Sequence, residues 1–181
     1  MKQVVPKNIR VKGKKVKKTE KKKKQEYGTS QLERDFAHDF LEANGLSYIY
    51  QYEATDIKRF YDFALVCDGV KTYKKEKKDG LESIVQHGQG IVPDLLIEID
   101  GSYFHSDPRV IKEDKLTPLQ KHNKFVDSLK DKWAGMHCIP LLRIWEYDIR
   151  KNPKKVLDTL SKYVKISKEK REKINKRKQP H

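Results

Sequence analysis

Apolar and polar residues alternate along the middle of the chain in runs that predict a succession of helices and strands. Residues 30–44 carry apolar side chains at helical spacing, with Ser30 in the position of an N-cap and Asn44-Gly45 as the stop. Shorter runs rich in aromatic and β-branched residues then predict three strands. These strands are expected at residues 46–54, 60–66 and 92–99.

The remaining pattern adds two helices and one more strand. Residues 119–134 are predicted to form a helix that stops at Gly135, and residues 138–145 are an apolar run of strand type. Pro153 then begins a last helix, predicted to reach about Val164. This order predicts an α/β fold: an α-β-β-β-α-β core with a mixed sheet, closed by the last helix.

A polar, Lys-rich insertion, residues 68–90, separates the second and third predicted strands. We expect it to be a hairpin extension or a flap that projects from the sheet edge and contacts a phosphate backbone. Because loop length costs little stability, its removal is expected to leave the domain folded.

Basic residues gather at the two ends of the chain. Residues 1–26 hold twelve Lys and Arg against two acids, and residues 165–181 hold eight against two. Since the whole chain has a net charge of +15, the segment between them, residues 27–164, has a net charge of −1. One near-neutral domain with a basic N-terminal arm and a basic C-terminal tail is typical of a protein that binds nucleic-acid phosphates. The alternative is that the lysine runs are only solvated ends.

Other features of the composition bear on the compartment and on the kind of metal site. No run of about 18 apolar residues is present, so the sequence predicts no membrane span. The basic N-terminus lacks the apolar stretch of a signal peptide, which favours an intracellular protein. Cys67 and Cys138 stand far apart and neither belongs to a Cys-x-x-Cys pair, so no structural zinc is expected.

Three carboxylates on the predicted strands are the strongest sign of chemistry. Glu98 and Asp100 stand two residues apart in one strand, so their side chains point to the same face. Asp62 lies in the strand-like run before it. Oxygen ligands of this kind suit Mg²⁺ (or Mn²⁺). The trio therefore predicts a metal-dependent phosphodiesterase.

Each of these residues also has a purely structural interpretation. A Glu98 buried among Leu and Ile needs a partner, and Arg143 on the fourth predicted strand competes with a metal for that role. Asp62 is also interpretable as a half-buried acid with satisfied hydrogen bonds. Glu33 stands in the first turn of the first helix, where a capping box accounts for it. His105, in the loop after the third strand, is either a functional histidine or simply an exposed one.

Five short motifs between residues 30 and 150 stand out in combination. They are Leu32-Glu33, Tyr61-Asp62-Phe63-Ala64, Ile97-Glu98-Ile99-Asp100-Gly101-Ser102-Tyr103-Phe104-His105, Asp127-Ser128-Leu129-Lys130 and Leu142-Arg143-Ile144-Trp145-Glu146. In this combination the chain resembles the PD-(D/E)XK, or restriction-endonuclease-like, superfamily. Within it, the chain is similar to the branch of very short patch repair and phage homing endonucleases. The resemblance implies a restriction-endonuclease-like fold and a nuclease in the cytoplasm of a bacterial or phage-infected cell.

The resemblance also implies roles for individual residues. Asp62 matches the metal-bridging aspartate, while Glu98 and Asp100 match the positions of the superfamily's acid and lysine. Glu33 matches a first-helix glutamate near the active site, and His105 matches the histidine that repair-type members use in catalysis. Position 100 departs from the pattern, since the superfamily prefers Lys there. The lysine's task of steadying the attacking water must therefore fall to another residue.

The sequence thus predicts a Mg²⁺-dependent endodeoxyribonuclease of nicking or homing type, with DNA, or RNA, as its partner. A homodimer is expected if both strands of a duplex are cut. The alternative is a non-catalytic nucleic-acid-binding protein that keeps the same fold. Phosphate contacts are expected from lysines of the N-terminal arm, the insertion and the second helix: Lys14, Lys15, Lys17, Lys18, Lys21, Lys22, Lys23, Lys24, Lys74, Lys75, Lys121, Lys124 and Lys130.

Overall fold

The computed structural model describes residues 30–66, 75–78, 80–84 and 91–178, and a four-stranded sheet lies at its centre. The strands are β1 (Tyr48–Ala54), β2 (Arg59–Leu65), β5 (Leu95–Asp100) and β6 (Leu141–Trp145), in the order β1-β2-β5-β6. β1 and β5 both run antiparallel to β2, whereas β6 runs parallel to β5. The predicted α/β class with a mixed sheet is therefore confirmed.

The first helical segment begins and ends at the residues that the sequence predicts. It consists of α1 (Gln31–Phe36), the π-helical turn η1 (Ala37–Leu41) and the 3-10 turn η2 (Glu42–Asn44). At its start Ser30 and Glu33 form both hydrogen bonds of a capping box. Gly45 follows its end with a φ of 64°, a left-handed conformation that a residue without a Cβ adopts without steric cost.

The later helices differ from the sequence prediction in their limits. They are α2 (Pro118–Met136), α3 (Glu146–Lys151) and α4 (Pro153–Lys178), with a short 3-10 turn, η3 (Glu113–Lys115), before α2. α2 starts at Pro118 behind a Thr117 cap and passes through Gly135, so the predicted stop at that glycine was wrong. α4 continues far beyond Val164, so its predicted end was also wrong. α3 was not predicted at all.

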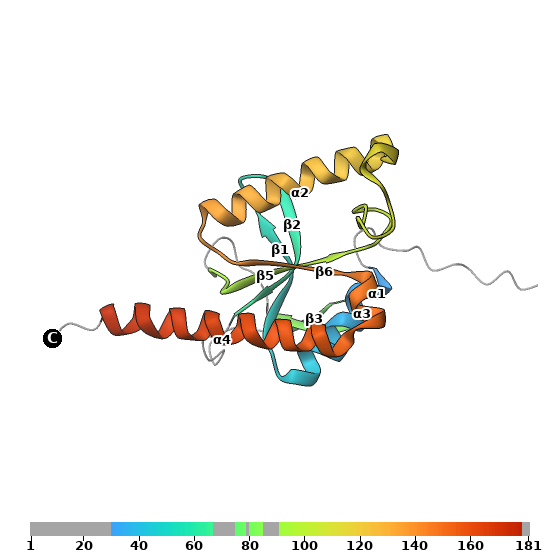
Figure 1. Cartoon of the computed structure of the whole chain (residues 1–181). Helices are drawn as coiled ribbons and strands as arrows, with labels where there is room; N and C mark the ends of the chain where they lie inside the picture. Colours follow the sequence, from blue (N-terminus) through green and yellow to red (C-terminus); the bar gives the residue numbers. More distant parts are fainter. Residues whose placement is uncertain (1–29, 67–74, 79, 85–90, 179–181) are drawn as a thin grey trace, which may run out of the picture.

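Helices cover both faces of the sheet (Figure 1). α1, η1 and α4 lie on one face, and α2 lies on the other. Buried residues of β5 divide between the two cores: Leu95, Ile97 and Ile99 face α4, whereas Leu96 faces α2. Since successive side chains of a strand alternate, Glu98 and Asp100 leave β5 on the α2 face.

The insertion is partly built into the core. β3 (Lys75–Lys78) and β4 (Leu81–Ile84) form an antiparallel hairpin, and the rest of residues 68–90 lies outside the described part apart from Gly80. Leu81 is fully buried in the α4-side core, and Ile84 is 1% exposed in the α2-side core. The expectation that the whole insertion projects from the sheet is therefore wrong for β4, because its apolar residues fill the core.

Candidate functional site

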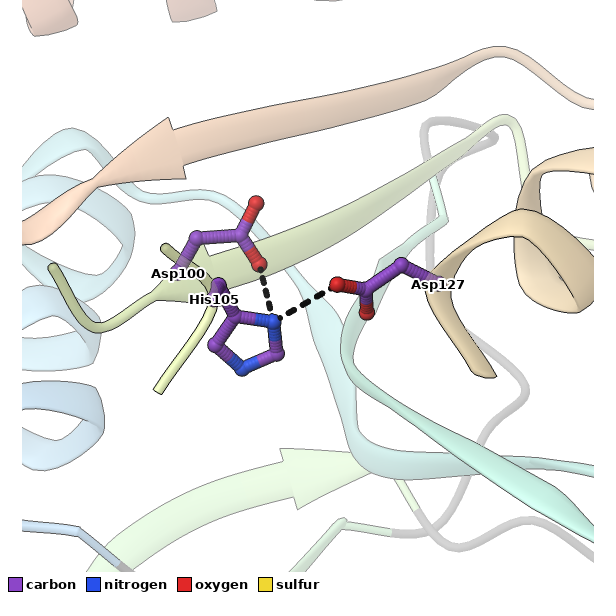
Figure 2. A group of neighbouring side chains, drawn as sticks. All are labelled: Asp100, His105 and Asp127. Atoms are coloured by element: carbon purple, nitrogen blue, oxygen red, sulfur yellow. Dashed lines mark hydrogen bonds and ion pairs between the residues drawn. The ribbon is translucent and has the colours of Figure 1, made fainter. Parts of the chain in front are cut away.

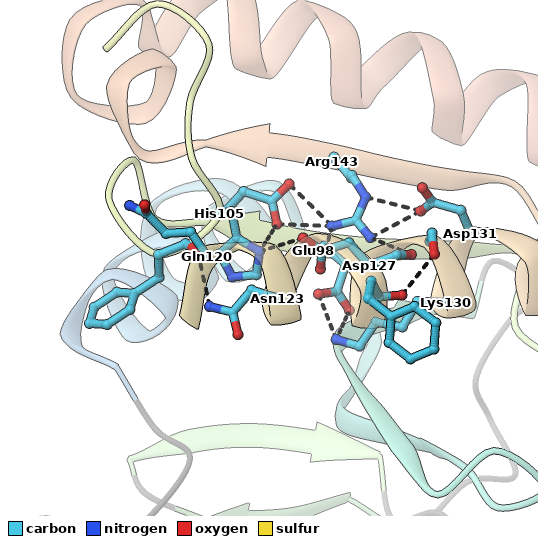
Figure 3. A network of polar contacts seen from close by, with 12 residues as sticks. Glu98, His105, Gln120, Asn123, Asp127, Lys130, Asp131 and Arg143 are labelled. Atoms are coloured by element: carbon cyan, nitrogen blue, oxygen red, sulfur yellow. Dashed lines mark hydrogen bonds and ion pairs between the residues drawn. The ribbon is translucent and has the colours of Figure 1, made fainter. Parts of the chain in front are cut away.

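The candidate site lies between β5 and the sheet-facing side of α2. Glu98 of β5 meets Lys130 of α2 there, and Arg143 of β6 lies nearby (Figure 3). Asp100, the second acid of β5, pairs with Arg143. Both carboxylates are only 2% exposed. Burial of an ionised carboxylate is costly unless it is paired, so each acid requires a cationic partner.

Glu98 pairs with Lys130 through both of its oxygens. The Lys130 Nζ lies 2.9 Å from Oε1 and 2.8 Å from Oε2 of Glu98. Tyr61 holds this lysine from the sheet: its hydroxyl donates to the Lys130 carbonyl at 2.7 Å, and its ring centroid lies 5.5 Å from the Nζ. The competing partner that we considered for Glu98, Arg143, binds Asp100 instead.

Asp62 lies where the regular alternation of side chains along β2 is interrupted. Its neighbours Tyr61 and Phe63 point into opposite cores, although residues at i and i+2 of a regular strand share a face. The pairing of β2 with β5 stops at Phe63. The Ile99 amide therefore donates to Oδ2 of Asp62, at 2.7 Å, in place of a backbone carbonyl.

Among the described residues Asp62 has no basic side chain within ion-pair distance, and its Oδ1 accepts no hydrogen bond. Burial raises the pKa of Asp62 well above its usual range, and the negative charges of Glu98 and Glu33 raise it further. The Ile99 amide and Lys130 oppose this rise without cancelling it. Asp62 thus has acidic neighbours and no ion-pair partner among the described residues, and its side chain is only partly buried.

Glu33 forms the capping box that the sequence predicts. Its carboxylate closes the capping box with the Ser30 amide and also accepts a hydrogen bond from the Tyr50 hydroxyl at 2.9 Å. Its charge acts on Asp62, as the raised pKa of that carboxyl records. We call Asp62, Glu98, Glu33 and Lys130 the Glu98 group.

A second set of side chains surrounds the loop histidine (Figure 2). The Nδ1 of His105 lies 2.9 Å from Oδ2 of Asp127 and 3.5 Å from Oδ1 of Asp100. Arg143 binds the same two acids, with its NH1 atom 3.0 Å from Asp100 and 3.5 Å from Asp127. Its guanidinium also contacts the exposed Asp131. We call Asp100, His105, Asp127 and Arg143 the His105 group.

Electrostatics favour the protonated form of this histidine. Burial lowers the pKa of His105, but the hydrogen bond with Asp127 and the charge of Asp100 outweigh burial and raise the pKa overall. Burial raises the pKa of Asp100, while Arg143 and His105 act in the opposite direction. The Asp127 pKa is lowered: burial opposes this, but the hydrogen bond with His105 prevails.

The two groups differ in charge balance. In the His105 group two carboxylates face one arginine and one histidine that favours its cationic form. In the Glu98 group three carboxylates have Lys130 as their ion-pair partner, and Arg143 acts on Glu98 only through its charge, without a direct contact to it. Asp100, His105 and Asp127 offer three ligand atoms within 4.8 Å of one another, a spacing that suits a metal ion. However, Arg143 already neutralises this group, so the unmet demand for positive charge lies at Asp62 and Glu98.

Two amide side chains of α2 position the loop that carries His105. Gln120 donates to the Tyr103 carbonyl at 2.7 Å, and Asn123 donates to the Phe104 carbonyl at 3.0 Å. Tyr103 is 58% exposed and Phe104 is 56% exposed. They meet edge to face, with ring centroids 5.4 Å apart. The loop thus presents two exposed aromatic rings directly beside the histidine.

The structure divides the predicted site residues between the two groups. Asp62, Glu98 and Glu33 fall in one, and Asp100 and His105 fall in the other. Among the described residues, Asp62, Glu98 and Asp100 are not a set whose ligand atoms all lie within 4.8 Å. As a trio they therefore do not offer the close ligand set that we expected; Asp100 is held by Arg143 instead.

Several polar residues of α2 escaped the sequence reasoning. Asp127, Gln120 and Asn123 were not assigned to the site, and Lys130 was expected at a phosphate rather than at Glu98. A signal was available, because positions 120, 123, 127 and 130 recur at helical spacing and define one polar stripe. In the structure this stripe meets β5 and the loop that follows it, where Lys130 binds Glu98 and Asp127 binds His105.

The other predicted phosphate contacts fall in three places. Lys121 is exposed, and Lys124 pairs on the surface with Glu113 at 3.0 Å. The side chain of Lys75 and all of Lys74 lie outside the described part. The same holds for the arm lysines: Lys14, Lys15, Lys17, Lys18, Lys21, Lys22, Lys23 and Lys24.

No family model, characterised protein or solved structure matches this chain. Within the described residues, no helix combines the length and the apolar character needed to cross a membrane. The functional argument therefore rests on the geometry and charge of the two groups.

Proposed function

We propose that this protein is a metal-dependent nuclease that hydrolyses phosphodiester bonds in DNA. The observation that carries the proposal is the unbalanced charge of Asp62, a half-buried carboxylate beside two other acids. Strongly shifted pKa values of neighbouring carboxylates cluster at functional sites. A divalent cation supplies the positive charge that the Glu98 group lacks.

The donor set of the Glu98 group fits Mg²⁺ or Mn²⁺. Asp62 and Glu98 would hold the cation through carboxylate oxygens, which these ions prefer over nitrogen and sulfur. When bound, the cation would acidify a water molecule and offset charge on the scissile phosphate. Glu33, fixed by Ser30 and Tyr50, keeps the local field negative and so raises the affinity of the site for a cation.

In the superfamily a lysine at the position of Asp100 steadies the attacking water. We assign this role to Lys130. It approaches Glu98 from α2 rather than from β5, yet its ammonium ends beside the same carboxylate. From there it can orient a water molecule or a phosphate oxygen as a compact point charge. On this proposal Lys130 would take the role that the superfamily pattern gives to a lysine at position 100.

His105 is assigned to proton transfer. Asp127 and Asp100 hold its Nδ1 and favour the imidazolium, which leaves Nε2–H as a donor. A protonated histidine beside a scissile phosphate serves as a general acid that protonates the leaving oxygen. Asp127 keeps the ring in one orientation.

The nucleic-acid substrate is inferred from charge and exposed aromatic surface. The basic ends of the chain supply non-specific attraction to phosphates. Tyr103 and Phe104 offer exposed rings on which bases can stack. DNA is our choice of substrate, with RNA as the variant that a direct comparison of the two substrates would distinguish.

A non-catalytic nucleic-acid-binding protein is the second candidate. One observation favours it: the third predicted ligand, Asp100, is engaged by Arg143 and His105. If Asp62 and Glu98 alone bind a cation too weakly for catalysis, the basic ends would still hold DNA or RNA.

The test is conversion of supercoiled plasmid to nicked or linear DNA with Mg²⁺, with Mn²⁺ and with EDTA. We expect metal-dependent nicking that Glu98→Gln abolishes without loss of DNA binding. Glu113→Gln, a change in a carboxylate that is 85% exposed on the surface, is the matched control and should retain full activity. Wild-type protein that binds plasmid but never nicks it with either metal would establish the second candidate instead.

A further inference from the structure

We propose that the Lys130 ammonium acts as a built-in competitor of the metal: it neutralises Glu98 in the metal-free protein and must leave that carboxylate before a divalent cation binds. The inference rests on the proposed function and concerns regulation of the same site. It makes metal affinity a property of Lys130 as well as of the acids.

The contact distances show that a lysine and a metal cannot share Glu98. The Nζ lies within 2.9 Å of both carboxylate oxygens, so it occupies the position that a cation bound by both oxygens of Glu98 would take. Divalent cations of this class bind oxygen at about 2.0–2.6 Å. Two positive charges on the same two oxygens would repel each other strongly in a buried site.

Burial explains why the lysine takes this position. The side chain of Glu98 is 3% exposed and that of Lys130 is 12% exposed, so bulk solvent does not stabilise the ionised carboxylate in the absence of a cation. Arg143, the nearest alternative, is held by Asp100, Asp127 and Asp131. Lys130 is thus the cation that neutralises Glu98 in the metal-free protein.

Tyr61 can remain in contact with Lys130 after its ammonium leaves Glu98. The Tyr61 hydroxyl fixes the Lys130 carbonyl, so the backbone stays in place while the four-carbon side chain swings. The ammonium already lies over the Tyr61 ring, 5.5 Å from its centroid, while it is bound to Glu98, so this cation–π contact can persist when the ammonium leaves the carboxylate. From there the ammonium is available to a phosphate of the substrate.

Titration calorimetry of the full-length protein with Mn²⁺ tests the proposal. Lys130→Met, which removes the charge, should bind Mn²⁺ about tenfold more tightly than wild type, because the repulsion is gone. Lys130→Arg, which keeps the charge, should stay within about twofold of wild type. Lys124→Met, on the exposed side of the same helix, is the matched control and should leave the affinity unchanged.

A second measurement does not depend on the folding of a variant. In crystals of the wild-type protein grown with Mn²⁺, the Lys130 Nζ should lie beyond hydrogen-bond distance of Glu98. A bound Mn²⁺ with the lysine still on that carboxylate, or a Lys130→Met variant that binds Mn²⁺ no better than wild type, overturns the inference while the proposed function stands. Failure of wild type and all three variants to bind Mn²⁺ overturns both.

Discussion

Asp62 is a carboxylate of the site without an ion-pair partner among the described residues. Its Oδ2 receives the Ile99 amide, yet burial and two acidic neighbours oppose its ionisation. A shift of one pKa unit corresponds to about 1.4 kcal/mol of difference between the two protonation states. Local strain of this kind is common at functional sites, where activity and stability conflict.

Asp62→Asn should therefore stabilise the metal-free protein. The asparagine oxygen can still accept the Ile99 amide, while the unfavourable charge is gone. Because the folded pKa of Asp62 is raised, the native carboxyl destabilises the fold increasingly as pH rises from the unfolded pKa of about 3.9 through the folded value. Thermal melts should show a gain of at least ~2 °C at pH 8 and a smaller gain at pH 4.5.

The same variant should lose the stabilisation that Mg²⁺ or Mn²⁺ gives to wild type. A protein that binds metal at this site gains stability by mass action, and a variant without the ligand does not. Asp158→Asn, on the outer side of α4, is a control that should change neither property. A destabilised Asp62→Asn protein at pH 8 would show that the carboxylate is satisfied after all.

His105 gives a prediction for the pH dependence of cleavage. Its folded pKa is raised, so the imidazolium and its stabilising contacts are fully present below the unfolded pKa of about 6.5 and are lost as pH rises through the folded pKa. If His105 is the general acid, activity should fall on the alkaline side. Asp127→Asn removes the contact that raises this pKa and should move the alkaline limb of the kcat profile to lower pH. An unmoved limb would assign the proton to another group.

At the level of single residues, the sequence predicts the face of a strand on which a side chain lies better than it predicts the residues that the side chain contacts. The two-residue spacing of Glu98 and Asp100 correctly places both on one face of a strand. It cannot reveal that Lys130 and Arg143 reach them, because those contacts depend on how α2 and β6 pack on β5. Partners that come from other elements are set by tertiary packing, which a local pattern does not contain.

The misplaced helix ends have an elementary explanation. Glycine within a helix costs only about 1 kcal/mol relative to alanine, and packing of Trp133 and Ala134 beside Gly135 offsets that amount. Residues 165–178 contain no glycine or proline and consist mostly of good helix formers, so charge alone does not end α4. The polar composition that we interpreted as a separate tail is equally compatible with an exposed helix.

β4 was misjudged for a different reason. Four residues of mixed polarity within a Lys-rich insertion give no periodic signal, yet Leu81 and Ile84 enter the two cores. β4 reaches those cores because it packs beside β1 and because Glu42 accepts the Glu82 amide at 3.4 Å. Glu42 and Glu82 are 40 residues apart, and β1 is also distant from β4 in the sequence, so local pattern analysis does not reveal these contacts.

Leu81→Ala should accordingly destabilise the domain. The leucine is fully buried, and truncation of such a side chain typically costs about 2–5 kcal/mol. Glu82→Ala, in the same strand but exposed, should cost less than about 0.5 kcal/mol and serves as the matched control. Urea denaturation would measure both. Equal stabilities would restore the interpretation of the insertion as a dispensable extension.

For the whole molecule, charge and chemistry are separated along the chain. The acidic groups of the site lie within the near-neutral segment 27–164, whereas the excess positive charge lies outside it. An acidic site repels a polyanion unless other parts of the protein attract it. Affinity for DNA should therefore depend on the ends of the chain more than on the residues that perform chemistry.

Removal of residues 1–26 tests this division. The deletion takes away a net charge of +10 and leaves α4, whose buried residues belong to the core, intact. Because each neutralised phosphate contributes roughly −0.9 to the slope of log K against log salt, the truncated protein should bind DNA more weakly and with a clearly shallower slope. It should still nick plasmid at low salt and high enzyme concentration, since the Glu98 group remains. An unchanged affinity and slope in fluorescence-anisotropy titrations would place the binding surface on the folded domain and assign the arm to a different polyanion.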